Sequence, residues 1–276
     1  MYKLTLFFCI FFHTYSAADI KTIFSLKEAQ HQLELLDSNA LVIFDVDETL
    51  IISLDKIRRK HPEEIISQFT KIYFNDRVKD IGHQEYLDSI RLKMSEQKLI
   101  ESQSAEIIDK LHKKNIRVIA LTHMHAGRFS TIQSMEEWRY QQLYNLAIDL
   151  TIGNPTNLIL KNLPKGTISH PVFHKGILAT SRSCSKGQAL VELLKQLNWQ
   201  PSSIIFFDDY QEHVNSVYDE MKKLNIPCTA FHYRTTEIMD TSINFELAKF
   251  QYQYLFEHET WLDDNHATKI MNNKQI

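Results

Sequence analysis

The sequence predicts an α/β fold whose centre is a doubly wound parallel sheet. Compact apolar runs occupy residues 41–44, 117–121 and 203–207. Such runs are typical of strands that are buried on both faces of a parallel sheet. Polar segments with helical spacing separate them, and strands that alternate with helices in this way indicate a sheet covered by helices on both faces.

The other elements follow from local signals along the chain. Ser25 and Glu28 form a capping box, which predicts a helix from there to about Leu36. Pro62 is typical of a helix start, and the segment 53–103 is polar and helical, with no good strand. The remaining signals predict, in order, a helix at 107–111, a helix at 136–146, a hairpin that turns at Lys175-Gly176, helices at 186–197 and 211–224, a strand at 228–232 and a helix at about 245–258.

Length and composition limit the classes of protein to consider. A chain of 276 residues is long enough for one large α/β domain with an inserted cap, or for two small domains. Its formal net charge is −3. The run 56–60 (KIRRK) is shorter than the basic blocks that grip a phosphate backbone. Nucleic acid is therefore not expected as a partner.

The first 18 residues have the pattern of a secretory signal peptide. Lys3 precedes an apolar run at 4–12, and the small residues Ser16-Ala17-Ala18 predict cleavage before Asp19. The run is shorter than the roughly 20 residues that cross a bilayer, so no membrane span is expected. We expect an exported protein, periplasmic or secreted; a buried N-terminal strand is the alternative.

Two cysteines, Cys184 and Cys228, remain in the chain after such a cleavage. They permit one disulfide, but the sequence does not decide between a disulfide and two free thiols. Neither belongs to a CxxC pair, so a zinc site is not supported.

Acidic and hydroxyl side chains stand where three of the expected strands end. Asp45 and Asp47 follow the first strand, Thr122 ends the second, and Asp208 and Asp209 follow the third. Open α/β sheets bind ligands at the carboxyl ends of their strands. Carboxylates gathered there repel one another unless a cation lies between them, and such oxygen ligands suit Mg²⁺. The residues thus predict a metal–carboxylate site at one sheet edge.

These residues lie in motifs that resemble those of the haloacid dehalogenase-like (HAD) superfamily. The run 45–49 (DVDET) is similar to the first motif, and Thr122, at the end of RVIALT, is similar to the second. Lys186 at a helix start resembles the third motif, and the run 204–209 (IIFFDD) resembles the fourth. The resemblance covers about residues 40–235. It implies a Rossmann-like (HAD-like) sheet with an inserted helical cap.

The resemblance also implies an activity, that of a Mg²⁺-dependent phosphatase that works through an aspartyl-phosphate. Asp45 is then the nucleophile that attacks phosphorus. Asp47 is the general acid that protonates the leaving oxygen and afterwards the base that activates water, and its backbone carbonyl completes the metal shell. The dehalogenase branch lacks this second acid, so Asp47 favours the hydrolysis of a phosphate monoester.

The later motifs supply the other implied roles. Thr122 donates a hydrogen bond to the phosphoryl oxygens, and Lys186 neutralises negative charge on the nucleophile and the phosphate. Asp209 is a direct Mg²⁺ ligand and Asp208 supports it, so the implied metal set is Asp45, Asp47, Asp208 and Asp209.

Three histidines have no role that the superfamily motifs explain, and two short segments resemble a smaller branch of the superfamily. His213 stands where relatives carry an acid or Asn, and its role, like the roles of His123 and His125, stays open. The segments 261–264 (WLDD) and 174–176 (HKG) resemble a smaller bacterial branch whose members are of unknown function.

The spacing of the motifs predicts the domain organisation. Residues 53–103 form a helical cap between the first two motifs, residues 19–52 and 104–276 form the core, and residues 123–183 form a covering insert. Two covers favour a small-molecule phosphate ester as the substrate; the oligomeric state is not indicated. The alternative is a catalytically weak, exported binding protein on this fold, or a factor directed at the host or the envelope. The presence of both Asp45 and Asp47 favours the enzyme.

Overall fold

The computed structural model describes residues 19–154, 156–240 and 242–273. The expected signal peptide at 1–18 lies outside the described residues. In the described chain the main sheet has eight strands in the order β1-β10-β9-β2-β5-β8-β7-β6, and β3 and β4 form a separate ribbon. The strands are β1 Asp19–Ile23, β2 Leu41–Phe44, β3 Ile51–Ser53, β4 Gln97–Leu99, β5 Arg117–Thr122, β6 Leu158–Ile159, β7 Val172–His174, β8 Ile177–Ala179, β9 Ile204–Asp208 and β10 Cys228–Tyr233.

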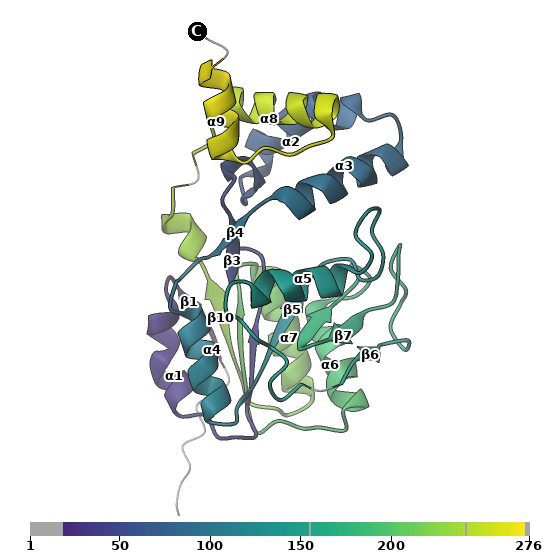
Figure 1. Cartoon of the computed structure of the whole chain (residues 1–276). Coiled ribbons are helices and arrows are strands. Elements are labelled where there is room, and N and C mark those ends of the chain that lie inside the picture. Colours follow the sequence, from purple (N-terminus) through teal and green to yellow (C-terminus); the bar gives the residue numbers. More distant parts are fainter. Residues whose placement is uncertain (1–18, 155, 241, 274–276) are drawn as a thin grey trace, which may run out of the picture.

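Helices cover both faces of the main sheet and form a second layer beyond one edge of it (Figure 1). They are α1 Gln30–Glu34, α2 Glu63–Tyr73, α3 Ile81–Met94, α4 Ser104–Lys113, α5 Met135–Tyr144, α6 Lys186–Gln196, α7 Gln211–Lys223, α8 Phe245–His258 and α9 Asp264–Asn273, with short 3₁₀ turns at Leu26–Ala29, Lys56–Arg58, Asn75–Arg77 and Thr235–Ile238. None of the described helices is long and apolar enough to cross a bilayer.

The sheet is mostly parallel and doubly wound, as the apolar runs predicted. All four residues of β2 are buried. Val42 and Phe44 pack with α4 on one face, and Leu41 and Ile43 pack with α6 and α7 on the other. Because successive side chains of a strand point to opposite faces, one apolar run supplies both cores. The predicted α/β fold class is confirmed.

The last strands in the order of the sheet, β7 and β6, pair in the antiparallel direction. β8 runs parallel to β5, whereas β7 and β6 are each antiparallel to their neighbour. The turn between β7 and β8 contains Lys175 and Gly176, both with positive φ. A Cβ at Gly176 would come within 2.1 Å of the Leu150 carbonyl oxygen, so only glycine fits the turn. The predicted hairpin is confirmed.

Other local expectations were wrong. The segment 53–103 does contain a strand, because β4 pairs antiparallel with β3. Each of these strands has only three residues, too few to show a period of two. By contrast, the capping box of Ser25 and Glu28 is confirmed, and the helix expected from there to about Leu36 is present as a 3₁₀ turn followed by the short α1, which ends at Glu34. The edge strand β1 and the helix α9 were not predicted.

The second layer is built from two distant parts of the chain. α2 and α3 come from the expected cap, and α8 and α9 come from residues that the sequence analysis assigned to the core (Figure 1). The ring of Tyr252 on α8 lies 5.9 Å from Phe69 and 5.6 Å from Phe74, measured between ring centroids. One buried cluster therefore joins the two segments. We call α2, α3, α8 and α9 the helical layer; the domain boundaries stay a prediction.

A buried carboxylate fastens the helical layer to the β3–β4 ribbon. Asp55 follows β3 and is fully buried. It accepts hydrogen bonds from Trp261 Nε1 at 2.8 Å, from Ser95 Oγ at 3.0 Å and from the backbone N–H of Asp264 at 3.0 Å. Burial raises the pKa of Asp55, and the donors oppose that rise. Asp55 is therefore buried with its hydrogen bonds satisfied, as buried polar groups in folded proteins usually are.

The two cysteines do not pair in the structure. Cys228 is buried on β10, and Cys184 is half-buried before α6. The alternative left open by the sequence is thus settled in favour of two free thiols.

Candidate active site

Parallel pairing brings the predicted site residues to one edge of the sheet. Phe44, the last residue of β2, is in register with Ala120 of β5 and Phe207 of β9. The residues that follow, Asp45 and Asp208, therefore emerge side by side, and the backbone N–H of Asp45 donates to the carbonyl of Phe207 at 2.8 Å. Thr122 ends β5 at the same edge and is buried.

Lys186 connects two of these strand ends. Its Nζ donates to Oδ1 of Asp45 and, at 2.6 Å, to Oδ2 of Asp208. The lysine is only 1% exposed, and Ser185 and Gln188 form a capping box that starts α6 at this residue. Buried charges need such pairing, since an isolated charge is expensive to remove from water.

The pKa values in this cluster reflect burial and charge together. Burial raises the pKa of Asp45 well above its usual range, although Lys186 opposes the shift. Burial alone would lower the pKa of Lys186, but Asp208 and Asp45 outweigh it and raise that pKa. Despite its burial, Asp208 has a lowered pKa because Lys186 and His213 favour its charged form.

Three carboxylates form a group that fits a divalent cation. Oxygens of Asp45, Asp208 and Asp209 all lie within 4.8 Å of one another. Two ammonium groups face these three acids: Lys186, and Lys60, which lies 2.6 Å from Asp209 and is 44% exposed. The acids thus outnumber the ammonium groups that contact them among the described residues, and their oxygens are hard donors of the kind Mg²⁺ prefers.

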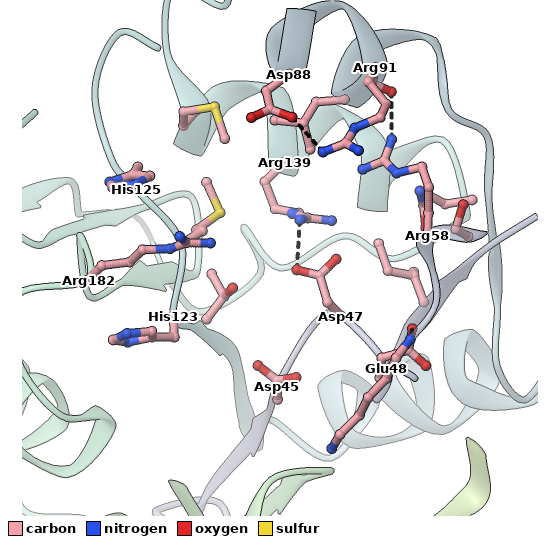
Figure 2. Close-up of a pocket in the computed structure, with 18 of the residues that line it drawn as sticks. Asp45, Asp47, Glu48, Arg58, Asp88, Arg91, His123, His125, Arg139 and Arg182 are labelled. Carbon is pink, nitrogen blue, oxygen red and sulfur yellow. Dashed lines mark hydrogen bonds and ion pairs between the residues drawn. The ribbon is translucent and has the colours of Figure 1, made fainter. Parts of the chain in front are cut away.

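Asp47 lies apart from that group, and its carboxylate points toward an arginine (Figure 2). Its side chain is 56% exposed and receives Nη2 of Arg139 at 2.8 Å. Arg139 comes from α5 and is only 5% exposed; Nη1 donates to Gln142, and Nε has no hydrogen-bond partner among the described residues. The structure thus places one predicted metal residue, Asp47, with its side chain away from the other three carboxylates.

Histidines line the rim of the site. His123 Nδ1 is 2.8 Å from Thr180 Oγ1, and His213 Nδ1 is 3.3 Å from Asp208 Oδ1. The two rings lie 5.6 Å apart, between centroids. Burial, with the nearby His213, lowers the pKa of His123 to about 4, so this imidazole is neutral at pH 7. Among the described residues, the group of side chains that could hold a metal ion contains Asp45, Asp208 and Asp209 and no histidine.

A cavity of about 740 Å³ lies between the strand ends and the helical layer. Asp45, Asp47, Thr122 and Asp209 line it from the sheet edge, while Lys186 and Asp208 sit behind that surface. Its wall carries both charges: the cations are Arg58, Arg59, Lys60, Arg91, Arg139 and Arg182, and the acids are Asp45, Asp47, Glu48, Glu85, Asp88 and Asp209. A volume of this size matches sites for small molecules.

Comparison with known proteins places the chain in a family. A family model described as "Protein of unknown function (DUF2608)" matches residues 22–268. The chain belongs to the DUF2608 family. An uncharacterised protein of Rickettsia prowazekii is 24% identical over 243 residues, covering 88% of this chain and 87% of the relative. An uncharacterised protein of Rickettsia bellii is 23% identical, covering 77% of this chain and 74% of the relative.

Among solved structures, a HAD-superfamily hydrolase of subfamily IA from Geobacter sulfurreducens is similar to this DUF2608 protein. The sequence identity is 13% and the TM-score is 0.38, and the match covers 73% of this chain and 96% of that one. This similarity is too weak to bear on the activity. The rickettsial relatives agree with the expected resemblance to a bacterial branch of unknown function.

Sequence reasoning missed the cations of the DUF2608 pocket. The run 56–60 was weighed only as a nucleic-acid contact, yet Arg58, Arg59 and Lys60 line the cavity. Arg139 gave no signal, since a helix of mixed polarity does not show which of its charges is buried. Arg182 follows a short strand whose place beside β5 only the fold reveals.

Proposed function

We propose that this chain is a Mg²⁺-dependent phosphate monoester hydrolase of the HAD type that acts on a small-molecule ester. The observation that carries the proposal is the position of Lys186, which bridges Asp45 and Asp208 beneath the pocket. A paired, hydrogen-bonded carboxylate at the floor of a cavity has the environment of a covalent nucleophile. The DVDET, Thr, Lys and DD motifs support the same reading.

The proposed reaction uses this chain's own residues in two steps. An oxygen of Asp45 forms a bond to phosphorus as the bond from phosphorus to the ester oxygen breaks, and Asp47 protonates the departing alcohol. Water then attacks phosphorus, gives its proton to Asp47 and releases phosphate and free Asp45. Lys186 and the Thr122 hydroxyl stabilise the charge on Asp45 and the phosphoryl oxygens.

Mg²⁺, held by Asp45, Asp209 and the backbone of Asp47, would offset the negative charge of the phosphate when bound. Asp208 would support that site from behind through Lys186 and His213.

We predict that hydrolysis of an aryl phosphate requires Mg²⁺. EDTA should abolish turnover and added Mg²⁺ should restore it, because the three acids at this edge outnumber the two ammonium groups that contact them in the described part of the chain. A second readout needs no activity: saturating Mg²⁺ should raise the free energy of unfolding, by about 2.7 kcal/mol at 100 times its Kd. Asp209→Asn should lose this gain, whereas Asp76→Asn, at an exposed acid outside the pocket, should keep it. Undiminished turnover in chelator would remove the metal from the mechanism.

We also propose that the protein is exported, on the strength of the pattern at 1–18. The mature chain should begin at Asp19, which mass spectrometry of periplasmic or secreted protein measures directly. Recovery of soluble protein with an intact Met1 from the cytoplasm, and none from the exported fractions, would contradict this prediction.

A further inference from the structure

The arginines of the pocket suggest the class of ester that it accepts. We propose that the substrate carries a second anionic group, a carboxylate or a second phosphate, which Arg139 and Arg182 bind. This inference rests on the proposed function and names its substrate class. In Figure 2 the two guanidinium groups approach the space above Asp45 from different sides.

Most of the pocket cations already have partners. Arg91 donates to Asp88 at 2.5 Å and to Tyr252 Oη at 2.6 Å, and Arg58 donates to the carbonyl of Arg91 at 2.6 Å. Arg59 donates to three backbone carbonyls, and Lys60 is paired with Asp209. Arg182 has no such partner among the described residues, and Arg139, although bonded to Asp47 and Gln142, keeps a buried Nε without one. These two arginines are the candidates for a ligand.

Arg182 lies on a turn whose backbone conformation is unusual and is fixed by hydrogen bonds. The residue follows β8, and both Ser181 and Arg182 have positive φ, 53° and 54°. This left-handed conformation is unfavourable for residues other than glycine and often occurs at functional sites. The turn is fixed from several sides: Thr180 N–H donates to Thr122 O at 3.1 Å, and Ser181 Oγ donates to Ser169 O at 2.7 Å.

The guanidinium of Arg182 has no carboxylate partner among the residues that the structure describes. It is exposed to the cavity that it lines, and Figure 2 shows it between His123 and His125. The turn that holds it is joined by a backbone hydrogen bond to Thr122, at the sheet edge that carries Asp45. The turn therefore places Arg182 at the wall of the cavity that Asp45 also lines, and no carboxylate among the described residues forms an ion pair with it.

Arg139 adds donors on another side of the cavity. Its Nε is buried without a partner among the described residues, and its Nη2 bonds to Asp47, whose side chain is half-exposed at the cavity. The proposed second anion binds Arg139 at this exposed side. Guanidinium groups bind carboxylates and phosphates through paired, charge-assisted hydrogen bonds. Because Lys186 already lies beneath Asp45 to balance the transferred phosphate, two further arginines fit a second anion.

The test compares esters that differ by one anionic group. Glycerol 3-phosphate and 3-phosphoglycerate differ by a carboxylate, and fructose 6-phosphate and fructose 1,6-bisphosphate differ by a phosphate. We expect kcat/KM to be at least about 10-fold higher for the more anionic member of one pair, and the pair that responds identifies the anion. A hydrogen bond between charged groups contributes a factor of about 10 to 100.

Two variants locate the effect in the pocket. Arg182→Gln should reduce that preference by about 10- to 100-fold, mainly through KM, and Arg182→Lys should restore part of it. Arg128→Gln removes the same charge from an exposed position that does not line the cavity, so it should keep the preference. Arg182 is exposed, so its loss leaves the fold intact, which circular dichroism checks. Equal kcat/KM within both pairs, or a preference unchanged in Arg182→Gln, would overturn the inference while aryl phosphate hydrolysis still supports the proposed function.

A binding measurement separates the two proposals if no ester is hydrolysed. The proposed function then fails, and calorimetric titration of the wild-type chain with the same four compounds becomes possible, because none is consumed. Tighter binding of the more anionic member, lost in Arg182→Gln, upholds the second-anion site by itself. Equal binding within both pairs overturns it.

Discussion

Replacing Asp45 by Asn is expected to abolish the hydrolysis of phosphate esters. The substitution removes the carboxylate that forms the aspartyl-phosphate, together with one oxygen of the acidic group at the sheet edge. Asp47→Asn keeps that carboxylate and removes only the proton donor and base, so it should lower the rate by about 10²- to 10⁴-fold. The residual rate should be least impaired for an aryl phosphate, whose leaving group needs little protonation. Steady-state kinetics on both variants measure the difference.

Beryllofluoride provides the matched control for this comparison. It mimics an acyl phosphate, so it should bind the wild-type protein at Asp45 and should not bind Asp45→Asn. Both variants must be folded, as judged by circular dichroism. If Asp45→Asn kept activity near that of the wild type, covalent catalysis at this residue would be wrong. If the wild type turned over no ester at all, the binding-protein alternative would have to be taken up.

Lys186→Met is expected to lower the free energy of unfolding by about 3–5 kcal/mol. The substitution leaves Asp45 and Asp208 buried without the ammonium group that lies between them. An unpaired buried charge is far more costly than the pair it came from. Urea denaturation in EDTA measures the change, since chelation prevents a metal ion from replacing the lost charge.

A surface lysine supplies the control for that measurement. Lys223 is 67% exposed and lies 2.8 Å from Glu220 on α7. Lys223→Met should therefore change the free energy of unfolding by no more than about 0.5 kcal/mol. A loss at Lys186 as small as the loss at Lys223 would show that the buried bridge does not stabilise the fold.

The part of this fold that the sequence predicted is the part encoded by short-range patterns. The run at 41–44 is apolar at every position and ends in acids, so both the buried strand and its acidic tip can be read within a few residues. Parallel sheets place such tips together by construction. For this reason Asp45, Thr122 and Asp208 could be grouped before the structure was known.

The part that the sequence did not predict depends on which surfaces meet. The helix at 245–258 was predicted with its observed bounds, but its spacing of apolar residues does not name the partner, and α8 packs on α2 and α3. Arg139 is similar: its charge is visible in the sequence, and its burial against Asp47 follows from the docking of α5. A three-residue strand such as β4 can be recognised only from its pairing with β3.

The way in which the helical layer is assembled has a consequence for synthesis of the chain. Asp55 and Trp261 are 206 residues apart in sequence, and contacts of such long range cost loop-closure entropy and form late. At about 5–20 residues per second on the ribosome, the segment of α2 and α3 emerges many seconds before α8. During that interval Phe69 and Phe74 lack their partner Tyr252, so this stretch of the nascent chain is open to chaperones, proteases and aggregation. The nascent protein can complete the cavity between the strand ends and the helical layer only after the residues around Trp261 have been synthesised.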